Sequence, residues 1–332
     1  MSDSEMPLGM HDRLASDKTK GAKLWLLAKF AITLTCFAVV FAKVGARPVW
    51  NRILSTPSTA ILLLSVSGAL QLSIAVWRWR GVLRSLGESV TWTVATRGVL
   101  VERFLNQALP STLGGDAARI AELIDSKVPL AKALHSVIFD RFLGLAGIVL
   151  VMGATIPLND LSSARSGLVT VTAGIFAAFA GGVALLSVPW SLGGGTIERC
   201  LPRSVLAFVE TARKLLSCPR IWGYGFGLSV LIQLLICATV YAVAAEMQIA
   251  LSLRAALTLV PGVIFFSLIP FSIAGWGARE GAMVALLGLE GVASRDALTL
   301  SVLLGIAQLL LGLVGGLLRL GLSRNCPPKS LA

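Results

Sequence analysis

Two ten-residue segments combine a helix-breaking proline, a small-residue turn and an arginine. They read PSTLGGDAAR at 110–119 and PFSIAGWGAR at 270–279, identical at four positions and conservatively exchanged at four more. A glycine turn that leads into a helix leaves free N–H groups at the helix start, which together with the positive end of the helix dipole bind anions. Arg119 and Arg279 add planar guanidinium groups that bind phosphate through two hydrogen bonds. The two segments therefore predict a site for phosphate or a phospholipid headgroup.

Three kinds of residue make up this candidate site. Arginines and the amides of turn glycines would bind the headgroup: Arg119, Arg279, Arg141, Gly114, Gly115, Gly275 and Gly277. Acidic and amide side chains would position the arginines or carry a coupled proton: Asp116, Asp140, Glu280 and Asn106. Two prolines would break the helices at the turns: Pro110 and Pro270. Charged residues in apolar segments are rare and commonly functional, which directs attention to this set.

The same charges could instead serve only the fold. Asp116 and Arg119 lie three residues apart, so on one helix they can pair with each other. Glu280 could pair with Arg279 or with a charge on another helix. The sequence leaves substrate contact and structural pairing open for both arginines.

A further charged pair, Asp140-Arg141, lies in the otherwise apolar run SVIFDRFLGLAGIVL. Neighbours in sequence point in different directions from a helix, so each should find a different partner. Arg141 could contact a headgroup, and Asp140 could hold Arg119 or Arg279. An interfacial pair near a helix start is the alternative.

The elements that must position these residues are membrane helices. Hydrophobic residues make up 55% of the chain and charged residues 14%, a composition typical of integral membrane proteins. A bilayer core about 30 Å thick needs about 20 apolar residues per helix. Six full spans are predicted, near Leu24–Lys43, Ser58–Trp77, Leu134–Thr155, Leu168–Val188, Ile221–Glu246 and Asp296–Leu322. Two apolar but broken segments, at 93–124 and 255–289, contain the repeated sequences and are expected to be re-entrant or kinked.

The predicted fold is therefore an all-α integral membrane protein with one polytopic domain at 22–324. A disordered polar N-terminus at 1–21 would precede it, and a C-terminal tail at 325–332 would follow it. The segment 201–216 has apolar residues at helical spacing with basic residues between them. It is expected to lie on anionic lipid, with a connector packed on the helix ends as the alternative.

Basic residues predict which side each connection faces. The connection after the second span holds Arg78, Arg80 and Arg84, and the connection before the fifth span and the C-terminal tail are also basic. Cytoplasmic loops carry an excess of such residues, so both termini should be cytoplasmic. With six spans the two broken segments then open from opposite sides, as inverted repeats. Inverted repeats with broken helices that meet near the middle of the membrane are a common transporter plan.

Other chemistry finds little support in the sequence. The two histidines and five cysteines are scattered, with neither metal-ligand nor CxxC spacing, and no P-loop sequence is present. The net charge of +12 lies mostly beside the predicted spans, so it indicates topology and anionic lipid rather than nucleic acid. No metal, no cofactor and no catalytic residue is expected.

Three segments carry a resemblance to a known family. RFLNQALPSTLGGDAARIAEL, SVIFDRFLGL and PFSIAGWGAREGAMVALLGL are similar to the transmembrane region of lysylphosphatidylglycerol synthases, and the resemblance extends over about 22–324. The chain looks like a standalone member without the soluble domain that attaches lysine to lipid. The resemblance implies a flippase-like membrane domain, and standalone members are associated with isoprenoid and glycolipid carriers.

The expected function is the movement of an anionic phospholipid, isoprenoid lipid or glycolipid between the leaflets of a bacterial inner membrane. Its partners would be membrane lipids with anionic headgroups, with envelope glycosyltransferases or lipid-biosynthesis enzymes as further candidates. Nucleic acid is not an expected partner. Two alternatives remain open, namely a membrane-embedded transferase or hydrolase acting on a lipid phosphate, and a non-catalytic scaffold of an envelope-lipid complex.

Overall fold

The computed structural model describes residues 44–109, 113–155, 163–187, 203–268 and 276–323, with isolated positions between 31 and 42. Within these residues the regular structure is helical throughout, and no strand occurs. The helices are α2 (Ala46–Leu54), α3 (Ser58–Ser85), α4 (Trp92–Ala108), α5 (Leu113–Asp125), α6 (Leu130–Thr155), α7 (Ser163–Ser187), α9 (Arg203–Leu216), α10 (Gly227–Glu246), α11 (Leu253–Ser267), α12 (Ala278–Gly288) and α13 (Ser294–Ser323). A π-helical turn, η3 (Ile221–Phe226), runs directly into α10. The prediction of an all-α fold is confirmed.

Four of the described helical segments are long and apolar enough to cross a membrane: Ser58–Ser85, Leu130–Thr155, Ile221–Glu246 and Ser294–Leu317. They coincide with four of the six predicted spans, although α3 continues beyond Trp77 to Ser85. α7 lies where the span Leu168–Val188 is predicted, and its apolar stretch is Val169–Ala184. The first predicted span, Leu24–Lys43, falls mostly outside the described residues.

The two broken segments each form a pair of shorter helices. α4 contacts α5, and α11 contacts α12. We call α4 and α5 the first helix pair and α11 and α12 the second helix pair. The connections within the pairs, at 110–112 and 269–275, lie outside the described residues.

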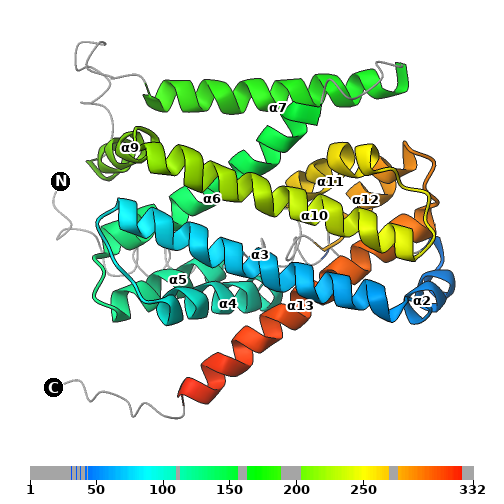
Figure 1. Cartoon of the computed structure of the whole chain (residues 1–332), viewed down its shortest axis with the longest axis horizontal. Coiled ribbons are helices and arrows are strands. Elements are labelled where there is room, and N and C mark those ends of the chain that lie inside the picture. Colours follow the sequence, from blue (N-terminus) through cyan, green and yellow to red (C-terminus); the bar gives the residue numbers. More distant parts are fainter. Residues whose placement is uncertain are drawn as a thin grey trace, which may run out of the picture.

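The two helix pairs enter the bundle from opposite ends (Figure 1). α3 and α10 are antiparallel, because Thr59 near the start of α3 donates to Glu246 at the end of α10. Further along, Arg78 of α3 donates to Ser229 near the start of α10. Since α4 follows the end of α3 and α11 follows the end of α10, the first helix pair begins at one end of the bundle and the second begins at the other. This is the arrangement that inverted repeats produce.

Helix ends repeat in the same order in the two halves of the chain. Residues with a positive φ follow α3, α5, α10 and α12: Gly87, Lys127, Gln248 and Gly291. At each of these four ends the next amide donates to a carbonyl five residues earlier, which is the Schellman pattern. Side-chain caps then open the equivalent helices, Thr91 for α4 and Ser252 for α11. The repeat therefore extends from the ten-residue segments to two four-helix units, 58–155 and 221–323.

α13 contacts both helix pairs through glycines. Gly312, Gly315 and Gly316 face α4, and a Cβ at Gly315 would lie 2.6 Å from the carbonyl carbon of Leu100. At the other end, Gly305 lies against the side chains of residues 276 and 279. Close backbone approach at small residues is a common way to pack helices in lipid.

Substitution Gly315→Ala is expected to destabilise the protein by about 1–3 kcal/mol, because the added methyl group overlaps the backbone of α4. The matched control is Gly281→Ala on α12, where nothing lies within 4 Å of the added Cβ. There alanine should be neutral or stabilise by up to about 1 kcal/mol through its better helix propensity. Thermal unfolding in detergent checks both, and equal midpoints for the two variants would contradict the close α4–α13 contact.

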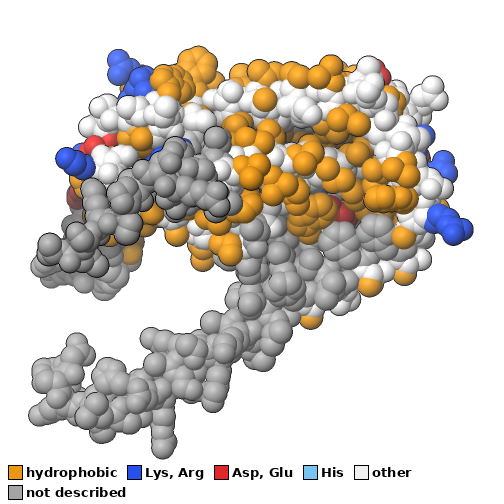
Figure 2. Space-filling model, turned by 90° about the horizontal axis from the view of Figure 1, so that it is seen from below, with side chains coloured by type: hydrophobic (Ala, Val, Ile, Leu, Met, Phe, Trp, Pro, Cys, Tyr) orange, Lys and Arg blue, Asp and Glu red, His pale blue; other side chains and the backbone are white. Residues whose placement is uncertain are grey.

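The outside of the bundle is apolar across its middle. Large hydrophobic side chains are exposed along α3, α10 and α13, among them Ile61, Leu62, Val66, Leu70, Leu231, Leu234, Leu310, Leu313 and Leu317. Figure 2 shows hydrophobic side chains across the centre of the face seen from below, with lysine and arginine toward the two ends. Such a large apolar surface is stable in lipid and unfavourable in water, so the protein is membrane-embedded.

α9 covers the segment predicted as an amphipathic helix. Its residues Ala212, Leu215 and Leu216 are buried with Phe139 of α6 and Ile221 of η3. The described apolar face of α9 is thus packed on protein, as in the connector alternative of the sequence analysis, rather than facing lipid.

Candidate functional site

A buried carboxylate on α6, Asp140, joins three helices. Its Oδ1 accepts a hydrogen bond from Arg78 Nε of α3 at 2.8 Å. Its Oδ2 accepts from both terminal nitrogens of Arg119 of α5, at 3.2 and 3.1 Å. Asp140 is 5% exposed and Arg119 only 2%. The expectation that Asp140 could hold Arg119 is therefore met, with Arg78 as an additional partner.

Arg119 has a second acidic partner and an aromatic one. Its Nη1 donates to Glu102 Oε2 of α4 at 2.9 Å. Its guanidinium carbon lies 3.9 Å from the centre of the Trp79 ring, and Trp79 in turn donates to Ser136. Cation–π contact adds to the ion pairs where water is excluded. Arg119 is thus held on three sides by groups from α3, α4 and α6.

Arg141 completes the network from the next position of α6. Its Nε donates to both oxygens of Asp116, at 2.9 and 2.7 Å, and its Nη2 lies 3.5 Å from Glu102 Oε1. Asp140 and Arg141 therefore have different partners, as their adjacency predicts. Asp116 pairs with Arg141 and not with Arg119 in its own helix. The Arg141 side chain is 37% exposed and is the most accessible member of the network.

These six residues form what we call the first charge cluster, and its charges balance: Arg78, Arg119 and Arg141 against Glu102, Asp116 and Asp140. An isolated charge at this depth costs several kcal/mol, whereas paired and hydrogen-bonded charges offset much of that cost. A further pair, Arg97–Glu122, links α4 to α5 outside the cluster.

The turn glycines of the first repeat segment allow α5 to approach α4 closely. A Cβ at Gly115 would lie 2.8 Å from the carbonyl oxygen of Glu102 and would also overlap Asn106. A Cβ at Gly114 would overlap Leu109. Both glycines lie in the first turn of α5 and face α4, so they serve helix packing in this structure. Pro110 lies just outside the described residues.

The second repeat segment forms a smaller cluster that we call the second charge cluster. Glu280 is fully buried and accepts from Arg279 at 3.1 and 2.8 Å and from Ser301 of α13 at 3.0 Å. Its other oxygen accepts from the amide of Gly277 at 2.6 Å. Gly277 has φ +86°, a conformation that favours glycine. Pro270 and Gly275 lie outside the described residues.

At the start of α12, a protein carboxylate occupies the place where the sequence predicts a bound anion. Glu280 satisfies the free amide at the N-terminus of its own helix while neutralising Arg279. An incoming phosphate would have to displace this carboxylate. The structural pairing left open by the sequence is thus the arrangement present in this structure for both Arg119 and Arg279.

Among the residues that the structure describes, a side-chain hydrogen bond joins the two helix pairs. Trp276, at the start of the second helix pair, donates through Nε1 to Gln107 of α4 at 3.2 Å. The Trp276 ring also stacks on Arg279, whose guanidinium carbon lies 4.7 Å from its centre. The inner ends of the two pairs therefore meet.

Two members of the site, Arg78 and Glu102, are not among the site residues predicted from the sequence. Arg78 was assigned with Arg80 to a cytoplasmic connection, which is wrong, because α3 continues to Ser85 and both side chains are 8% exposed. Arg78 pairs with Asp140, whereas Arg80 donates to the Val90 carbonyl. The sequence does contain a signal for the longer helix. In WRWR at 77–80, Trp77 and Trp79 alternate with the arginines, and their large apolar rings indicate that the apolar helix continues.

Within the described part of the chain, no group of three or more His, Cys, Asp and Glu side chains could hold a metal ion. The carboxylates that the fold brings together are each paired with arginine.

Comparison with known proteins gives one positive result. A family model described as the lysylphosphatidylglycerol synthase TM region matches residues 26–316. No curated protein matches the chain. The matched region includes both helix pairs and both charge clusters. The chain therefore belongs to the lysylphosphatidylglycerol synthase TM region family, a family of membrane domains associated with lipid-related functions.

Proposed function

We propose that this protein moves an anionic lipid between the two leaflets of a bacterial inner membrane. The observation that carries the proposal is the pair of inverted four-helix units. Each sends a short helix pair into the bundle from a different end, the two pairs touch at their inner ends, and each unit holds a buried arginine paired with a carboxylate. Transporters built from inverted repeats use such a meeting point as the substrate site, with alternating access from the two sides.

The surface and interior have the polarity that a lipid requires. Acyl chains could remain against the apolar exterior of α3, α10 and α13 while the headgroup passes along buried charges. Membership of a lipid-associated family supports the same substrate class. Under this proposal Arg141 meets the headgroup first, because it is the exposed member of the first charge cluster.

Binding at Arg119 or Arg279 would then proceed by exchange. A lipid phosphate would replace Asp140 or Glu102 on Arg119, and Glu280 on Arg279, so that each arginine remains neutralised. The released carboxylate could bind a proton or another arginine. Such exchange avoids leaving any charge unpaired in a low-dielectric environment.

A membrane-embedded transferase or hydrolase fits this arrangement less well. Such an enzyme needs a carboxylate positioned to give or take a proton. The oxygens of Asp116, Asp140 and Glu280 already accept hydrogen bonds from arginine, so none of the three is placed to exchange a proton with a substrate in this arrangement. The geometry therefore favours translocation over hydrolysis or group transfer.

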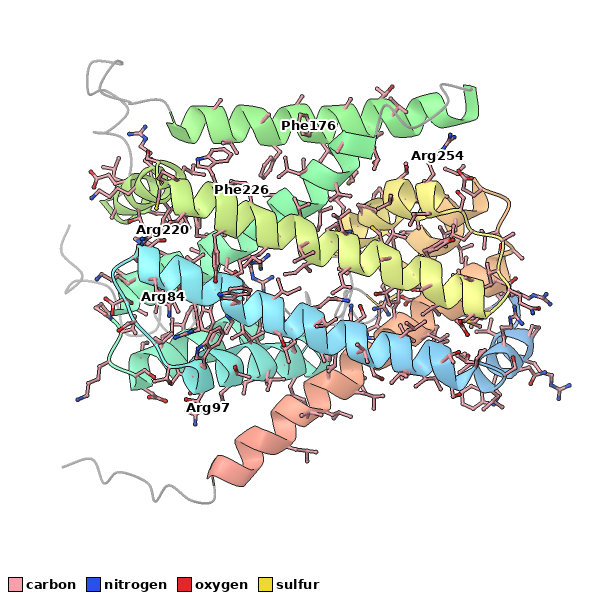
Figure 3. All side chains as sticks on the ribbon, in the orientation of Figure 1. Arg84, Arg97, Phe176, Arg220, Phe226 and Arg254 are labelled. Atoms are coloured by element: carbon pink, nitrogen blue, oxygen red, sulfur yellow. The ribbon has the colours of Figure 1, made fainter. Side chains whose placement is uncertain are left out.

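The proposed orientation places the end of the bundle with the first helix pair in the cytoplasm. Figure 3 shows Arg84 and Arg220 at that end, whereas Arg254 lies at the end of the second helix pair. α9, at the same end as Arg220, adds Arg213 and Lys214 in its last turn. The excess of basic residues at one end agrees with the positive-inside rule and would leave both termini in the cytoplasm.

Translocation can be measured in vesicles that contain fluorescent phosphatidylglycerol and purified protein. A reductant that cannot cross the membrane bleaches the outer leaflet, and further bleaching reports lipid arriving from inside. We expect wild type to bleach the inner-leaflet lipid faster than protein-free vesicles do. Arg141→Gln should slow this phase by about tenfold, since one charge-assisted hydrogen bond is lost.

The matched control for this assay is Arg84→Gln, which removes one positive charge from an exposed position at the end of α3. It should behave as wild type. Wild-type vesicles that bleach no faster than protein-free vesicles, although the protein is helical and correctly inserted, would contradict the proposal and favour a scaffold.

A further inference from the structure

One arginine beside the two charge clusters has no acidic partner. Arg103 lies on α4, next to Glu102, and its side chain is only partly exposed. Among the residues that the structure describes, no carboxylate lies within ion-pair distance of its guanidinium group. Arg80 also has no acidic partner, but it donates to the carbonyl of Val90 and stacks on the ring of Trp92.

Arg103 lies between the two charge clusters. It is one helical turn before Gln107, the residue that bonds Trp276 of the second helix pair. In the other direction, it lies within electrostatic range of Glu102, Arg78, Arg119 and Asp140, of which Glu102 acts on it most strongly without pairing with it. Its backbone packs on α13 at Gly312. The position is thus the inner side of α4, where the two helix pairs meet.

The count of charges makes this residue unusual. The first charge cluster holds three arginines and three carboxylates, and the second holds one of each. Adding Arg103 gives these described side chains one more positive than negative charge. A charged side chain in an apolar environment is stabilised by an ion of opposite sign or by hydrogen-bond acceptors, and the described residues give Arg103 neither.

Two polar atoms near Arg103 also have no hydrogen-bond partner. Arg119 Nε is a donor and Asn106 Oδ1 is an acceptor; both are buried and unpaired, and of the two only the Arg119 donor can bind an anion. Arg119 is 2% exposed, so this N–H has no access to bulk water. Buried donors usually have partners, so an unpaired one beside an unbalanced arginine points to an acceptor from outside the chain.

We propose that Arg103 binds one phosphate anion at the meeting point of the two helix pairs, and that this anion is the phosphodiester of a lipid. A phosphodiester carries a single negative charge, which balances Arg103, and it offers acceptor oxygens to Arg119 Nε. This inference rests on the proposed function only for the source of the anion. It assigns the central step of binding to a residue outside the repeated segments.

Native mass spectrometry can test the site with an equimolar mixture of phosphatidylglycerol and phosphatidylcholine that have the same acyl chains. Both lipids contain a phosphodiester, so the ratio retained by the protein reports preference for net negative charge. We expect wild type to retain phosphatidylglycerol preferentially. Arg103→Gln should reduce this preference by about tenfold, and Arg103→Lys should retain part of it.

A second variant tests the same idea without removing the arginine. Gln107→Glu places a carboxylate one turn from Arg103 and keeps an acceptor for Trp276. The protein then supplies its own counter-charge, so phosphatidylglycerol preference should also fall about tenfold while the melting temperature is unchanged or higher. Arg84→Gln, with the same change in net charge, should retain the wild-type ratio.

The outcomes separate the possible explanations. An unchanged ratio of phosphatidylglycerol to phosphatidylcholine in Arg103→Gln would overturn the site. The site would also be overturned if Arg103→Gln and Gln107→Glu both lose the preference and both melt at a clearly lower temperature, because Arg103 would then be a structural arginine. Release of phosphatidylglycerol by millimolar inorganic phosphate would overturn a lipid source for the anion. If wild type retains lipid through Arg103 but moves none in vesicles, translocation is wrong and the site stands. If wild type moves lipid and Arg103→Gln moves it at the same rate, translocation stands and the Arg103 site is wrong.

Discussion

Substitution Asp140→Asn is expected to lower the free energy of unfolding by about 3–5 kcal/mol, the range for breaking a buried ion pair. Asn keeps the size of the side chain but loses the charge that Arg78 and Arg119 share. The new amide nitrogen would also point a donor at one of two guanidinium groups. Arg78 would then have Ser229 as its remaining side-chain partner in the described residues.

Thermal unfolding in detergent measures this effect, and the midpoint should fall by on the order of 10 °C. Glu88→Gln is the matched control, because Glu88 pairs with Lys132 at a position where the lysine is 43% exposed. Its effect should stay below about 1 kcal/mol. The double variant Arg78→Gln/Asp140→Asn should be more stable than Asp140→Asn alone. Additive losses would show that the two side chains are not coupled.

Substitution Glu280→Gln should also cost about 3–5 kcal/mol, for a related reason in the second charge cluster. Gln retains an oxygen that can accept from the Gly277 amide, so the start of α12 stays capped. The charge is lost, however, and Arg279 remains 4% exposed without a carboxylate. The midpoint of thermal unfolding and the helix content by circular dichroism together report the result.

Two companion variants separate charge from capping at this site. Arg279→Gln/Glu280→Gln removes both charges and should recover much of the stability lost in Glu280→Gln. Glu280→Ala removes the cap as well as the charge, so it should be about 1 kcal/mol less stable than Glu280→Gln. If Glu280→Gln unfolds at the wild-type midpoint, the Arg279–Glu280 pair contributes nothing to stability.

Much of the helical plan is readable from the sequence because hydropathy over about 20 residues is a strong signal. The span at Ile221–Glu246 agrees at both ends with η3 and α10. The end of α3 was misplaced because Arg78 and Arg80 resemble the basic flank of a span. Hydropathy shows that Arg78 is charged but carries no information on its ion-pair partner. That partner, Asp140, lies on another helix 62 residues away.

The candidate site was identified in part from the repeated segments. They indicate Arg119, Arg279 and Glu280, but they do not indicate which carboxylate holds which arginine. Pairing of Asp116 with Arg141 instead of Arg119 depends on how α5 rotates against α6, which local spacing does not contain. Arg103 was not predicted as a site residue for a similar reason. Its lack of an acidic partner follows only from the tertiary structure, which shows the side chains around it.

The first charge cluster is also local in sequence, and this bears on how the chain enters the membrane during synthesis. Its residues all come from the consecutive helices α3, α4, α5 and α6, and the longest sequence separation between two bonded partners is the 62 residues between Arg78 and Asp140. Asp and Arg each add about 2.5–3.5 kcal/mol to the insertion cost of a lone helix. Since every charge in the cluster has its partner by residue 141, the first charge cluster can neutralise itself before the second four-helix unit is translated. Helices α3 to α6 should therefore leave the insertion machinery as one group.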